Sequence, residues 1–443
     1  MTLTHPDTLG SGTFTTEESP VEQSTATAEP EAGKSASSFA KSLLLGDIHE
    51  EMVFPWPEPD PAEQEKVSAL CARAREIGAS IDHRKVEEER WIGDDVIAEL
   101  GASGLCGLYV DEKYGGQGLS QTGYARVFET FAQIDATLSI VLGVHQSIGY
   151  KGIALFGTDE QKERWLPDLV AGRALAGFGL TEPGSGSDAG ATATRATLDG
   201  DQWVIDGAKQ FITNSGTSIT SCVSVTAWTG TTDDGKPEIS AIIVPSGTPG
   251  FTVEPAYDKL GWRASDTHPL TFENCRVPAD NLLGQRGKGF AQFLATLDDG
   301  RIAIAALAVG CIQAMVDASV AYANERTAFG VPIGRKQGVA FQIADLQVMV
   351  EAARMLTYKA AALRDAGRPA AEIKQAAAIA KLYATESAVT ATRIATQVHG
   401  GYGFMEEYPV ARFYRDAKIL EIGEGTSEIQ RILIARGLGL PVE

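Results

Sequence analysis

Apolar residues recur at helical spacing from about residue 61 to residue 172. Val67, Leu70, Cys71 and Ala74 follow one another at intervals of three and four positions, which places them on one face of a helix. A second stripe of this kind runs through 127–134. Polar residues fill the intervening positions, as on the solvent side of an amphipathic helix. This part of the chain therefore predicts a helical domain.

The pattern changes between residues 174 and 284. Short runs rich in β-branched and aromatic residues replace the helical stripes, and turn dipeptides such as Asp199-Gly200 and Asp234-Gly235 separate them. The runs that predict strands are 202–205, 222–228, 239–244, 251–254 and 270–272. Short strands joined by tight turns favour a small antiparallel barrel or sandwich.

The chain becomes helical again beyond residue 288, with alanine-rich apolar runs over 302–323, 341–366 and 370–398. Long apolar-striped helices joined by short loops are typical of an antiparallel bundle. The expected fold class is therefore a multidomain α and β protein, in which two helical domains flank an antiparallel β domain. The expected divisions are a tail over 1–50, a helical domain over 51–173, a β domain over 174–287 and a four-helix bundle over 288–443.

Residues 1–37 are rich in Thr, Ser, Glu, Ala and Gly and carry few large apolar side chains, so burial cannot offset their ordering entropy. We expect the first 50 residues to be a disordered acidic tail with a short apolar patch near 39–48. This segment has neither the features of a secretory signal nor the arginines of a transit peptide. With no run of about 18 apolar residues, a cytoplasmic protein without a membrane span is expected.

The 443 residues carry a formal net charge of −20. Nucleic acids and anionic membranes bind basic surfaces, so this acidic excess argues against both as partners. The five cysteines are scattered, odd in number and form no C-x-x-C pair. They indicate buried thiols in a reducing compartment, with no structural zinc site.

One carboxylate has an unusual setting near the C-terminus. Glu424 stands between Gly423 and Gly425, so the backbone can approach a ligand closely there. Ser427 and Gln430 predict a capping box at the start of a helix just beyond it. The helix dipole favours the charged carboxylate, whereas burial under an apolar substrate favours the neutral form. Glu424 is therefore a candidate general base, and the alternative is an ordinary carboxylate at a helix start.

Three other segments accompany the Glu424 segment in a characteristic order. They are Thr181-Glu182-Pro183-Gly184-Ser185-Gly186-Ser187-Asp188, Phe211-Ile212-Thr213-Asn214 and Gln397-Val398-His399-Gly400-Gly401-Tyr402-Gly403-Phe404. With this order and spacing, the chain resembles the acyl-CoA dehydrogenase family from about Phe54 to its C-terminus. Features at 39–56 and 145–149 are similar to the very-long-chain branch of that family, whose C-terminal extension is missing here.

The resemblance implies an FAD-dependent enzyme that converts an acyl-CoA thioester to trans-2-enoyl-CoA. That reaction removes a weakly acidic α-proton with a positioned base, while the β-hydrogen leaves as hydride to the flavin. Glu424 matches the family's base. Some relatives carry the base just before an arginine in the first long helix of the last domain, where this chain has Gly300 before Arg301. Glu424 is thus the one candidate at the two known positions.

The resemblance also implies two sets of flavin contacts. The residues that match contacts to the flavin ring and pyrophosphate within one subunit are Phe178, Leu180, Thr181, Ser187, Phe211 and Thr213. The residues that match contacts to the adenosine and pyrophosphate of a flavin in a neighbouring subunit are Arg326, Phe329, Gln337, Gln397, Gly400 and Gly401. Thr426 and Glu428, beside the base, complete the cofactor set. The cofactor site is then completed by a homo-oligomer, with a tetramer favoured over a dimer.

The residues implied to line the acyl-CoA site are Ser139, Gly143, Ser187, Leu297, Asp298, Arg301, Gly423 and Gly425. A surface ion pair at a helix start is the alternative for Asp298 and Arg301. The small side chains of Ser139 and Gly143 suit a deep tunnel, which predicts medium-to-long straight acyl chains. Gly423, where relatives carry an aromatic residue, suits a branched or ring-bearing acyl group as the alternative. Coenzyme A is an anion, so its phosphates need local arginines or helix N-termini.

The expected electron acceptor is an electron-transfer flavoprotein. The alternatives are an acyl-CoA oxidase on the same fold, in which oxygen reoxidises the flavin, a non-catalytic flavin-binding scaffold, and a flavin monooxygenase of similar fold. No residue separates the dehydrogenase from the oxidase. The presence of Glu424 argues against the scaffold and the monooxygenase, neither of which needs a base at this position.

Overall fold

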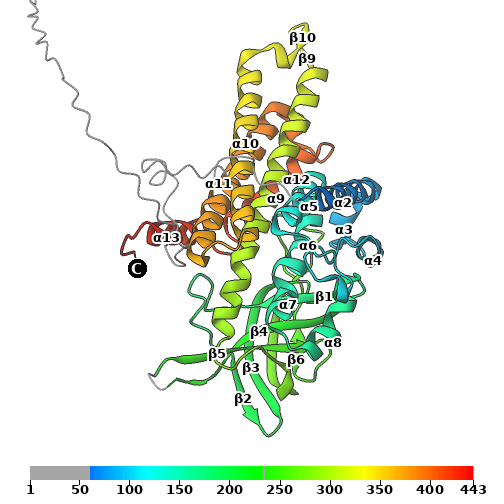
Figure 1. Ribbon diagram of the computed structural model, residues 1–443. Helices are drawn as coiled ribbons and strands as arrows, with labels where there is room; N and C mark the ends of the chain where they lie inside the picture. Colours follow the sequence, from blue (N-terminus) through cyan, green and yellow to red (C-terminus); the bar gives the residue numbers. More distant parts are fainter. Residues whose placement is uncertain (1–59, 233–234, 443) are drawn as a thin grey trace, which may run out of the picture. The chain divides into compact units, whose positions relative to one another are not determined.

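The protein, described here over residues 60–232 and 235–442 of a computed structural model, begins with a series of helices (Figure 1). The expected tail and apolar patch before residue 60 lie outside the described residues. The helices are α2 (Pro61–Ser80), α3 (His83–Glu89), α4 (Asp94–Ala102), α5 (Gln121–Ile134), α6 (Ala136–Gly143), the π-helical turn η3 (Val144–Gly149), α7 (Lys151–Phe156) and α8 (Asp159–Val170), with a 3-10 turn η2 at Glu112–Tyr114. The face of α2 predicted from the spacing of its apolar residues is buried.

The strands β1 to β8 follow and form one eight-stranded sheet with the order β6-β7-β3-β2-β4-β5-β8, in which β1 pairs with β4. Their bounds are β1 (Leu175–Gly179), β2 (Arg195–Asp199), β3 (Gln202–Thr213), β4 (Thr220–Thr231), β5 (Pro237–Pro245), β6 (Phe251–Val253), β7 (Thr267–Pro278) and β8 (Leu282–Leu283), with a 3-10 turn η4 at Ala279–Asn281. The predicted strands are confirmed within β3 to β7, whereas β1 and β2 were not predicted. The β3–β7 and β4–β5 pairs are antiparallel, but β1 runs parallel to β4.

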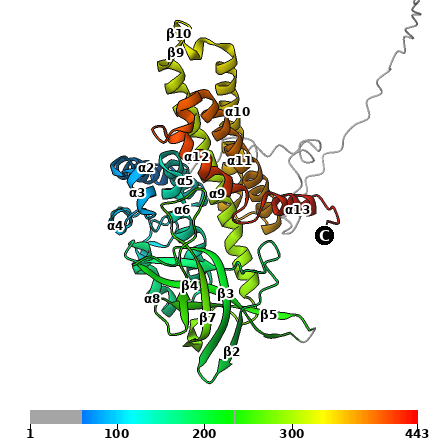
Figure 2. The same cartoon turned by 180° about the vertical axis from the view of Figure 1, so that it is seen from behind.

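The last part of the chain is the expected helical bundle. It contains α9 (Gly289–Glu325), α10 (Gln337–Asp365), α11 (Ala370–His399), α12 (Pro409–Ala417) and α13 (Ser427–Gly437), the short strands β9 (Thr327–Ala328) and β10 (Val331–Pro332), and the 3-10 turns η5 (Ile333–Arg335), η6 (Gly400–Phe404) and η7 (Lys418–Glu421). Helices α9, α10 and α11 run side by side in both views (Figures 1 and 2). The β9–β10 hairpin joins α9 to α10 at the end of the bundle away from the sheet.

Helix α9 is the central element of the bundle. Its residues 299–312 are all buried, because α5, α10 and α11 pack around it. It meets α5 at Gly310, where a Cβ atom would lie 2.2 Å from the carbonyl oxygen of Glu129. The sequence did not predict a helix apolar enough to cross a membrane, but α9 is long and apolar enough to do so. Since 78% of its most apolar 18-residue segment is buried inside the protein, these apolar side chains form part of the core.

Buried ion pairs fasten the first helices to the bundle. Asp299 of α9 binds Lys151 of α7 and Arg364 of α10, each at 2.8 Å. Glu129 of α5 binds Arg354 of α10 at 2.9 Å. Breaking a pair of this kind leaves an uncompensated buried charge, so the helices are held in one register.

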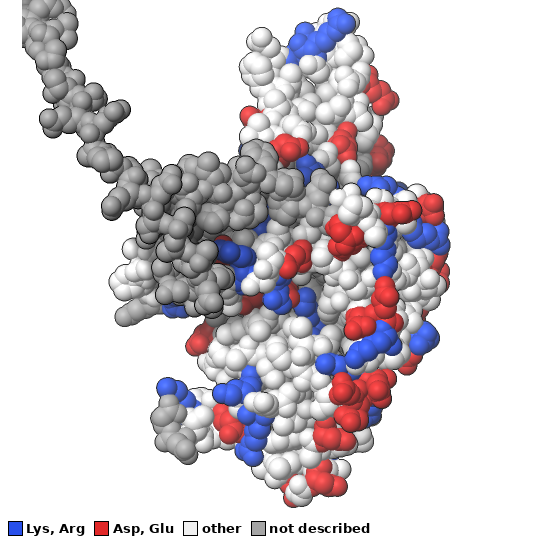
Figure 3. Space-filling model, viewed as in Figure 1, with Lys and Arg blue, Asp and Glu red and all other residues white. Residues whose placement is uncertain are grey.

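The charged residues at the surface are mixed. On the face shown in Figure 3, acidic and basic side chains of the described residues are interspersed over the helices and the sheet. The five cysteines, all within the described residues, are free and buried, which confirms their interpretation as small core residues.

Candidate functional site

Glu424 lies in the loop between η7 and α13, in a left-handed backbone conformation with φ of +54°. Such a conformation is uncommon for a residue with a side chain and has to be imposed by the surroundings. Gly425 continues the turn with φ of +92°. The predicted capping box is wrong by one residue, because Thr426 is the N-cap and its hydroxyl accepts the amide of Ile429 at 3.3 Å. Ser427 instead begins the helix with its side chain buried.

The carboxylate of Glu424 is withdrawn from water. Within the described residues, both of its oxygens are buried and neither has a well-formed hydrogen bond. Burial raises the pKa of Glu424 to about 7, although the positive charges of Lys381, Arg301 and Lys151 oppose the shift and the hydroxyl of Ser147 opposes it more weakly. A carboxylate with a pKa near 7 is suited to accept a proton at neutral pH.

Gly300 of α9 lies directly against this carboxylate. A Cβ atom at position 300 would lie 2.2 Å from Oε2 of Glu424 and 3.5 Å from the side chain of Ile148. The two positions considered for the base therefore face the same space from opposite sides. A side chain at position 300 cannot coexist with Glu424 in this position. This agrees with the sequence, which has glycine at position 300 and glutamate at position 424.

The π-helical turn η3 forms the wall beside Glu424. It places Ser147 and Ile148 next to the carboxylate, and π-helical turns occur frequently at functional sites. Ile148 and Val144 belong to the same apolar cluster as Ile302 of α9. The sequence analysis did not single out these apolar residues, although a spacing of four between valine and isoleucine indicates a shared helix face.

The residues predicted to line the acyl-CoA site have different surroundings. Ser139 is fully buried and its hydroxyl donates to the carbonyl oxygen of Asp135 at 3.0 Å. Beside Gly143, the ring of Phe128 lies 3.2 Å from the position of a Cβ atom. Neither position therefore borders an open tunnel, while Leu297, which is half-buried, packs against the apolar cluster that contains Ile148.

Arg301 and Asp298 form an ion pair one turn apart on α9. The side chain of Arg301 is only 5% exposed and its Nε has no hydrogen-bond partner among the described residues. The pair is therefore not a surface ion pair, because the guanidinium is buried beside Glu424. Gly423 and Gly425 are both half-buried in the Glu424 loop.

The structure brings together the two segments predicted to bind the flavin ring. The amide of Gln210 donates to the carbonyl oxygen of Thr181 at 2.9 Å, so the loop after β1 lies beside the end of β3. Phe178 stacks on Phe293 of α9 with 4.2 Å between ring centroids. Phe211 is 59% exposed, has φ of +61° and contacts Tyr257.

The remaining residues of this ring set lie at the same edge of the sheet. Leu180, Thr181 and Thr213 are half-buried, and Ser187 is exposed in the glycine-containing loop. A Cβ atom at Gly184 or Gly186 would meet nothing within 4 Å, so the backbone there is open to a ligand.

A buried ion pair that the sequence analysis missed supports the Thr181 loop. Glu182 accepts from Nζ of Lys209 at 2.6 Å and from the amide of Ala193 at 2.6 Å, and the hydroxyl of Thr192 also donates to it. Burial alone would raise the pKa of Glu182, but the charge and hydrogen bond of Lys209 lower it to about 2. The same burial lowers the pKa of Lys209 to about 8.

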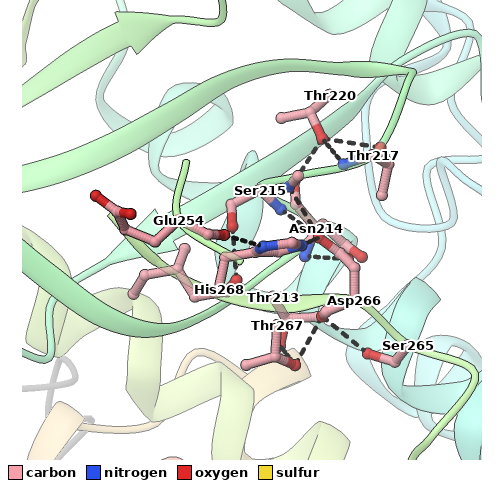
Figure 4. A network of polar contacts seen from close by, with 12 residues as sticks. Thr213, Asn214, Ser215, Thr217, Thr220, Glu254, Ser265, Asp266, Thr267 and His268 are labelled. Atoms are coloured by element: carbon pink, nitrogen blue, oxygen red, sulfur yellow. Dashed lines mark hydrogen bonds and ion pairs between the residues drawn. The ribbon is translucent and has the colours of Figure 1, made fainter. Parts of the chain in front are cut away.

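A second polar network holds the segment after Phe211 (Figure 4). The carboxylate of Asp266 accepts the amides of Asn214, Ser215 and Gly216 at 2.8 to 3.0 Å. The side chain of Asn214, at φ of +57°, donates to the carbonyl oxygen of Val141 in α6. The loop that carries Thr213 is thereby tied both to β7 and to the first helical domain.

The residues predicted to reach a neighbouring flavin lie at another place. Arg326 follows the end of α9 and, with Gly400 and Gly401, lines a groove of about 460 Å³. Phe329 is 94% exposed in the hairpin between β9 and β10, with φ of +53°. Gln337 at the start of α10 and Gln397 at the end of α11 are exposed. Phe178 contacts Phe293, and the roughly 33 residues of α9 from there to Arg326 rise about 1.5 Å each, so Arg326 lies about 50 Å from Phe178.

The other two residues in the predicted cofactor set are close to Glu424. The hydroxyl of Thr426 is used as the helix cap, and Glu428 is exposed in the first turn of α13. His145 and Gln146 are fully buried and bind backbone groups, so they have structural roles.

Comparisons with known proteins match most of the described chain. Family models for the acyl-CoA dehydrogenase N-terminal, middle and C-terminal domains match residues 62–173, 177–275 and 287–439. A probable acyl-CoA dehydrogenase, YngJ, of Bacillus subtilis is 48% identical over 364 residues, 82% of this chain and 94% of the relative. The mitochondrial short-chain specific acyl-CoA dehydrogenase of Bos taurus is 43% identical over 351 residues, 79% of this chain and 84% of the relative. The solved structure of butyryl-CoA dehydrogenase from Megasphaera elsdenii is 39% identical, with a TM-score of 0.81 over 87% of this chain and 100% of that one.

The Glu182–Lys209 pair generates a prediction about stability. Replacing Lys209 with Met leaves Glu182 buried without its charge partner, so we expect the free energy of unfolding to fall by about 3–5 kcal/mol and the protein to retain less flavin. Denaturant unfolding and the flavin-to-protein absorbance ratio measure the two effects. Lys85→Met, which removes an exposed pair with Glu89, is the control and should change the free energy by about 1 kcal/mol or less. Equal effects of the two substitutions contradict the prediction.

Proposed function

Since the chain belongs to the acyl-CoA dehydrogenase family, we propose that it removes the α-proton of an acyl-CoA thioester with Glu424 as the base. Members of this family use FAD, and this protein is an oxidoreductase that acts on CH–CH groups. The product is the trans-2-enoyl-CoA. The observation that carries the proposal is the desolvated carboxylate of Glu424, whose pKa is raised to about 7 by burial, opposite Gly300.

The chemistry requires a base of this kind. The α-hydrogen of a thioester is a weak acid, so the base must be ionised at working pH and yet have a high enough pKa to accept a proton. A water-exposed glutamate with a pKa near 4.3 is ionised but weakly basic. Burial of Glu424 raises its basicity, and the neighbouring cations keep part of it ionised near neutral pH.

The residues at the edge of the sheet fit a flavin. The exposed ring of Phe211 provides an aromatic wall. The open glycine loop around Ser187 lets a phosphate approach the backbone, and the backbone of Thr213 provides polar contacts. When bound there, FAD supplies the acceptor for the hydride that leaves the β-carbon. Phe178, Leu180 and Thr181 would hold the ring side, and the Glu182–Lys209 pair and Asp266 keep the two loops in place.

Short straight acyl chains are the preferred substrates in this proposal. The sequence predicted medium-to-long chains from small residues at Ser139 and Gly143, but Phe128 fills the space beside Gly143 and Ser139 is fully buried. Two of the relatives reported above have a substrate in their names: one is a short-chain specific acyl-CoA dehydrogenase and the other is a butyryl-CoA dehydrogenase. A shallow acyl site bounded by Ile148 and Val144 agrees with both.

A second copy of the chain completes the cofactor site in this proposal. Arg326 and Phe329 are about 50 Å from the ring set, too far to touch the same FAD within one chain. The exposed face of α10 carries Phe341, Val348 and Met355 at intervals of seven residues, an apolar stripe suited to another helical surface. A tetramer in preference to a dimer, an electron-transfer flavoprotein as acceptor and a cytoplasmic location remain predictions from the sequence.

Replacing Glu424 with Gln tests the base. The variant keeps the shape of the side chain but cannot accept the α-proton, so we expect bound flavin to be retained and its bleaching by acyl-CoA to fall at least 1,000-fold, roughly the upper part of the range for acid–base groups. In the wild type the bleaching rate should rise with pH through about 7, because Glu424 must be ionised. Anaerobic stopped-flow absorbance measures both. Glu421→Gln, which removes a carboxylate paired with Lys418, is the control, and near-normal bleaching by Glu424→Gln would overturn the mechanism.

An acyl-CoA series tests the chain length. Butyryl-CoA and hexanoyl-CoA should bleach the flavin faster than palmitoyl-CoA, because the ring of Phe128 fills the space beside Gly143. Phe128→Leu, which removes that ring, should move the preferred acyl length toward longer chains. A wild-type enzyme that reacts fastest with palmitoyl-CoA, or only with branched short acyl groups, refutes this part of the proposal. Hydrogen peroxide formed in air during turnover would identify an oxidase instead.

Dilution tests the shared cofactor site. We expect flavin to be released as the oligomer dissociates, with the same concentration dependence for flavin fluorescence and for mass measured by light scattering. Val348→Glu places a charge on the apolar stripe of α10 and should weaken both assembly and flavin retention. Gln347→Glu, which adds the same single charge at an exposed position of α10 turned about 100° away from Val348, is the control for the added charge. Full flavin retention by a true monomer contradicts the shared site.

A further inference from the structure

A buried lysine that no motif indicated lies behind the Glu424 loop. Lys381 is on α11, in an alanine-rich stretch, and is completely buried. Its Nζ donates to the carbonyl oxygen of Gly425 at 2.8 Å. Lysine is almost never fully buried unless its charge has a purpose or a partner, so this position requires a physical reason.

The hydrogen bond of Lys381 acts on the strained part of the loop. The same carbonyl oxygen of Gly425 accepts a second hydrogen bond from Nε2 of Gln430 at 2.9 Å. These two donors hold the peptide that follows Glu424, where the backbone has positive φ at both Glu424 and Gly425. A non-glycine residue in this conformation persists only where its surroundings over-determine it.

The charge of Lys381 is also the least neutralised of those near Glu424. Lys151 is paired with Asp299 and Arg301 with Asp298, whereas no carboxylate lies within ion-pair distance of Lys381 among the described residues. Burial lowers the pKa of Lys381 to about 8, and Glu424 is the largest influence that opposes this shift. In turn, Lys381 is the largest influence that opposes the raised pKa of Glu424.

Other titratable groups face this pair from every neighbouring element. Tyr124 of α5 lies near Glu424, and burial raises its pKa well above the usual value, so it stays neutral. Glu421 and Glu428, on either side of the loop, favour the charged form of Lys381 more weakly than Glu424 does. On α7 and α9, Lys151 and Arg301 act on Glu424 from within their own ion pairs.

We propose that Lys381 is the positioning residue of the base: its ammonium fixes the Gly425 carbonyl and supplies the positive charge that keeps Glu424 ionised at neutral pH. The proposal deepens the proposed function and depends on Glu424 being the base. A purely structural role needs only the hydrogen bond, which Gln430 already provides to the same oxygen without a charge. The two donors therefore allow geometry and charge to be separated by mutation.

Lys381→Met and Gln430→Met, each purified with bound flavin, are compared in the anaerobic bleaching reaction with butyryl-CoA across pH 6 to 10. Loss of the positive charge makes Glu424 harder to ionise, so the midpoint of the rate against pH should rise by about one unit in Lys381→Met. The rate at pH 7 should then fall about fivefold and largely recover near pH 9. Because Lys381 and Glu424 titrate close together, the midpoint describes the pair rather than either group alone.

The other variants identify the cause. Lys381→Arg retains the charge and should restore the wild-type midpoint, and Gln430→Met should lower the rate at every pH without moving the midpoint. Lys374→Met, the same exchange at a half-buried position earlier on α11, controls for the substitution. If Lys381→Met does not fold, Lys381→Gln, which keeps an amide donor without the charge, gives the same comparison.

The possible failures are distinguishable. A rate lowered equally at all pH values in Lys381→Met, with an unchanged midpoint, shows a structural role and overturns this inference while the proposed function stands. Near-normal bleaching by Glu424→Gln overturns the proposed function itself. An inactive Glu424→Gln together with an upward midpoint in the Lys381 variant supports both.

Discussion

The site depends on keeping one carboxylate out of water without leaving its charge uncompensated. Both oxygens of Glu424 are buried, and three cations reach it from three helices: Lys151 from α7, Arg301 from α9 and Lys381 from α11. Isolated in an apolar interior, the carboxylate would be neutral, and in water it would be a weak base. Packing of the first helices against the bundle sets the balance, because each cation belongs to a different element. The Asp299 pairs with Lys151 and Arg364 join α7 and α10 to α9.

The sequence singled out Glu424 and the glycine-containing loops because those features depend on local chemistry. A glutamate between two glycines and the open loop at Ser187 are local patterns, and the structure places both as expected. Lys381 and Lys209 could not be found in this way. A lysine in a helical or β pattern is ordinarily interpreted as solvent-facing, and what buries each one is a partner far along the chain, Gly425 for the first and Glu182 for the second. The helix cap at Thr426 was misplaced because Thr426 and Ser427 are both good caps, and the backbone turn at Gly425 decides between them.

The errors in the fold have a similar origin. Strand β1, Leu175–Gly179, contains two glycines and an alanine and lacks the β-branched residues on which strand predictions depend. It forms because it is covered by η3 on one side and pairs with β4, a contact of residues more than 40 positions apart. Conversely, α9 has the composition of a membrane helix because it is enclosed by other helices. Composition reports how apolar the surroundings are, and only the tertiary arrangement shows whether they are lipid or protein.

Gly300 and Glu424 show how two positions far apart in the sequence can face one space. A side chain from α9 and a side chain from the loop before α13 would point into the same small space, since a Cβ at position 300 would lie 2.2 Å from the Glu424 carboxylate. A carboxylate at either place would therefore occupy the same small space, and a side chain at position 300 would displace the Glu424 carboxylate from where it lies. What differs is its support: the Glu424 loop depends on Lys381 and Gln430 through the Gly425 carbonyl, whereas a base on α9 would be held by the helix itself. Glu424 lies on a loop with positive φ, and the charges near it come from α11 through Lys381, from α9 through Arg301 and from α7 through Lys151.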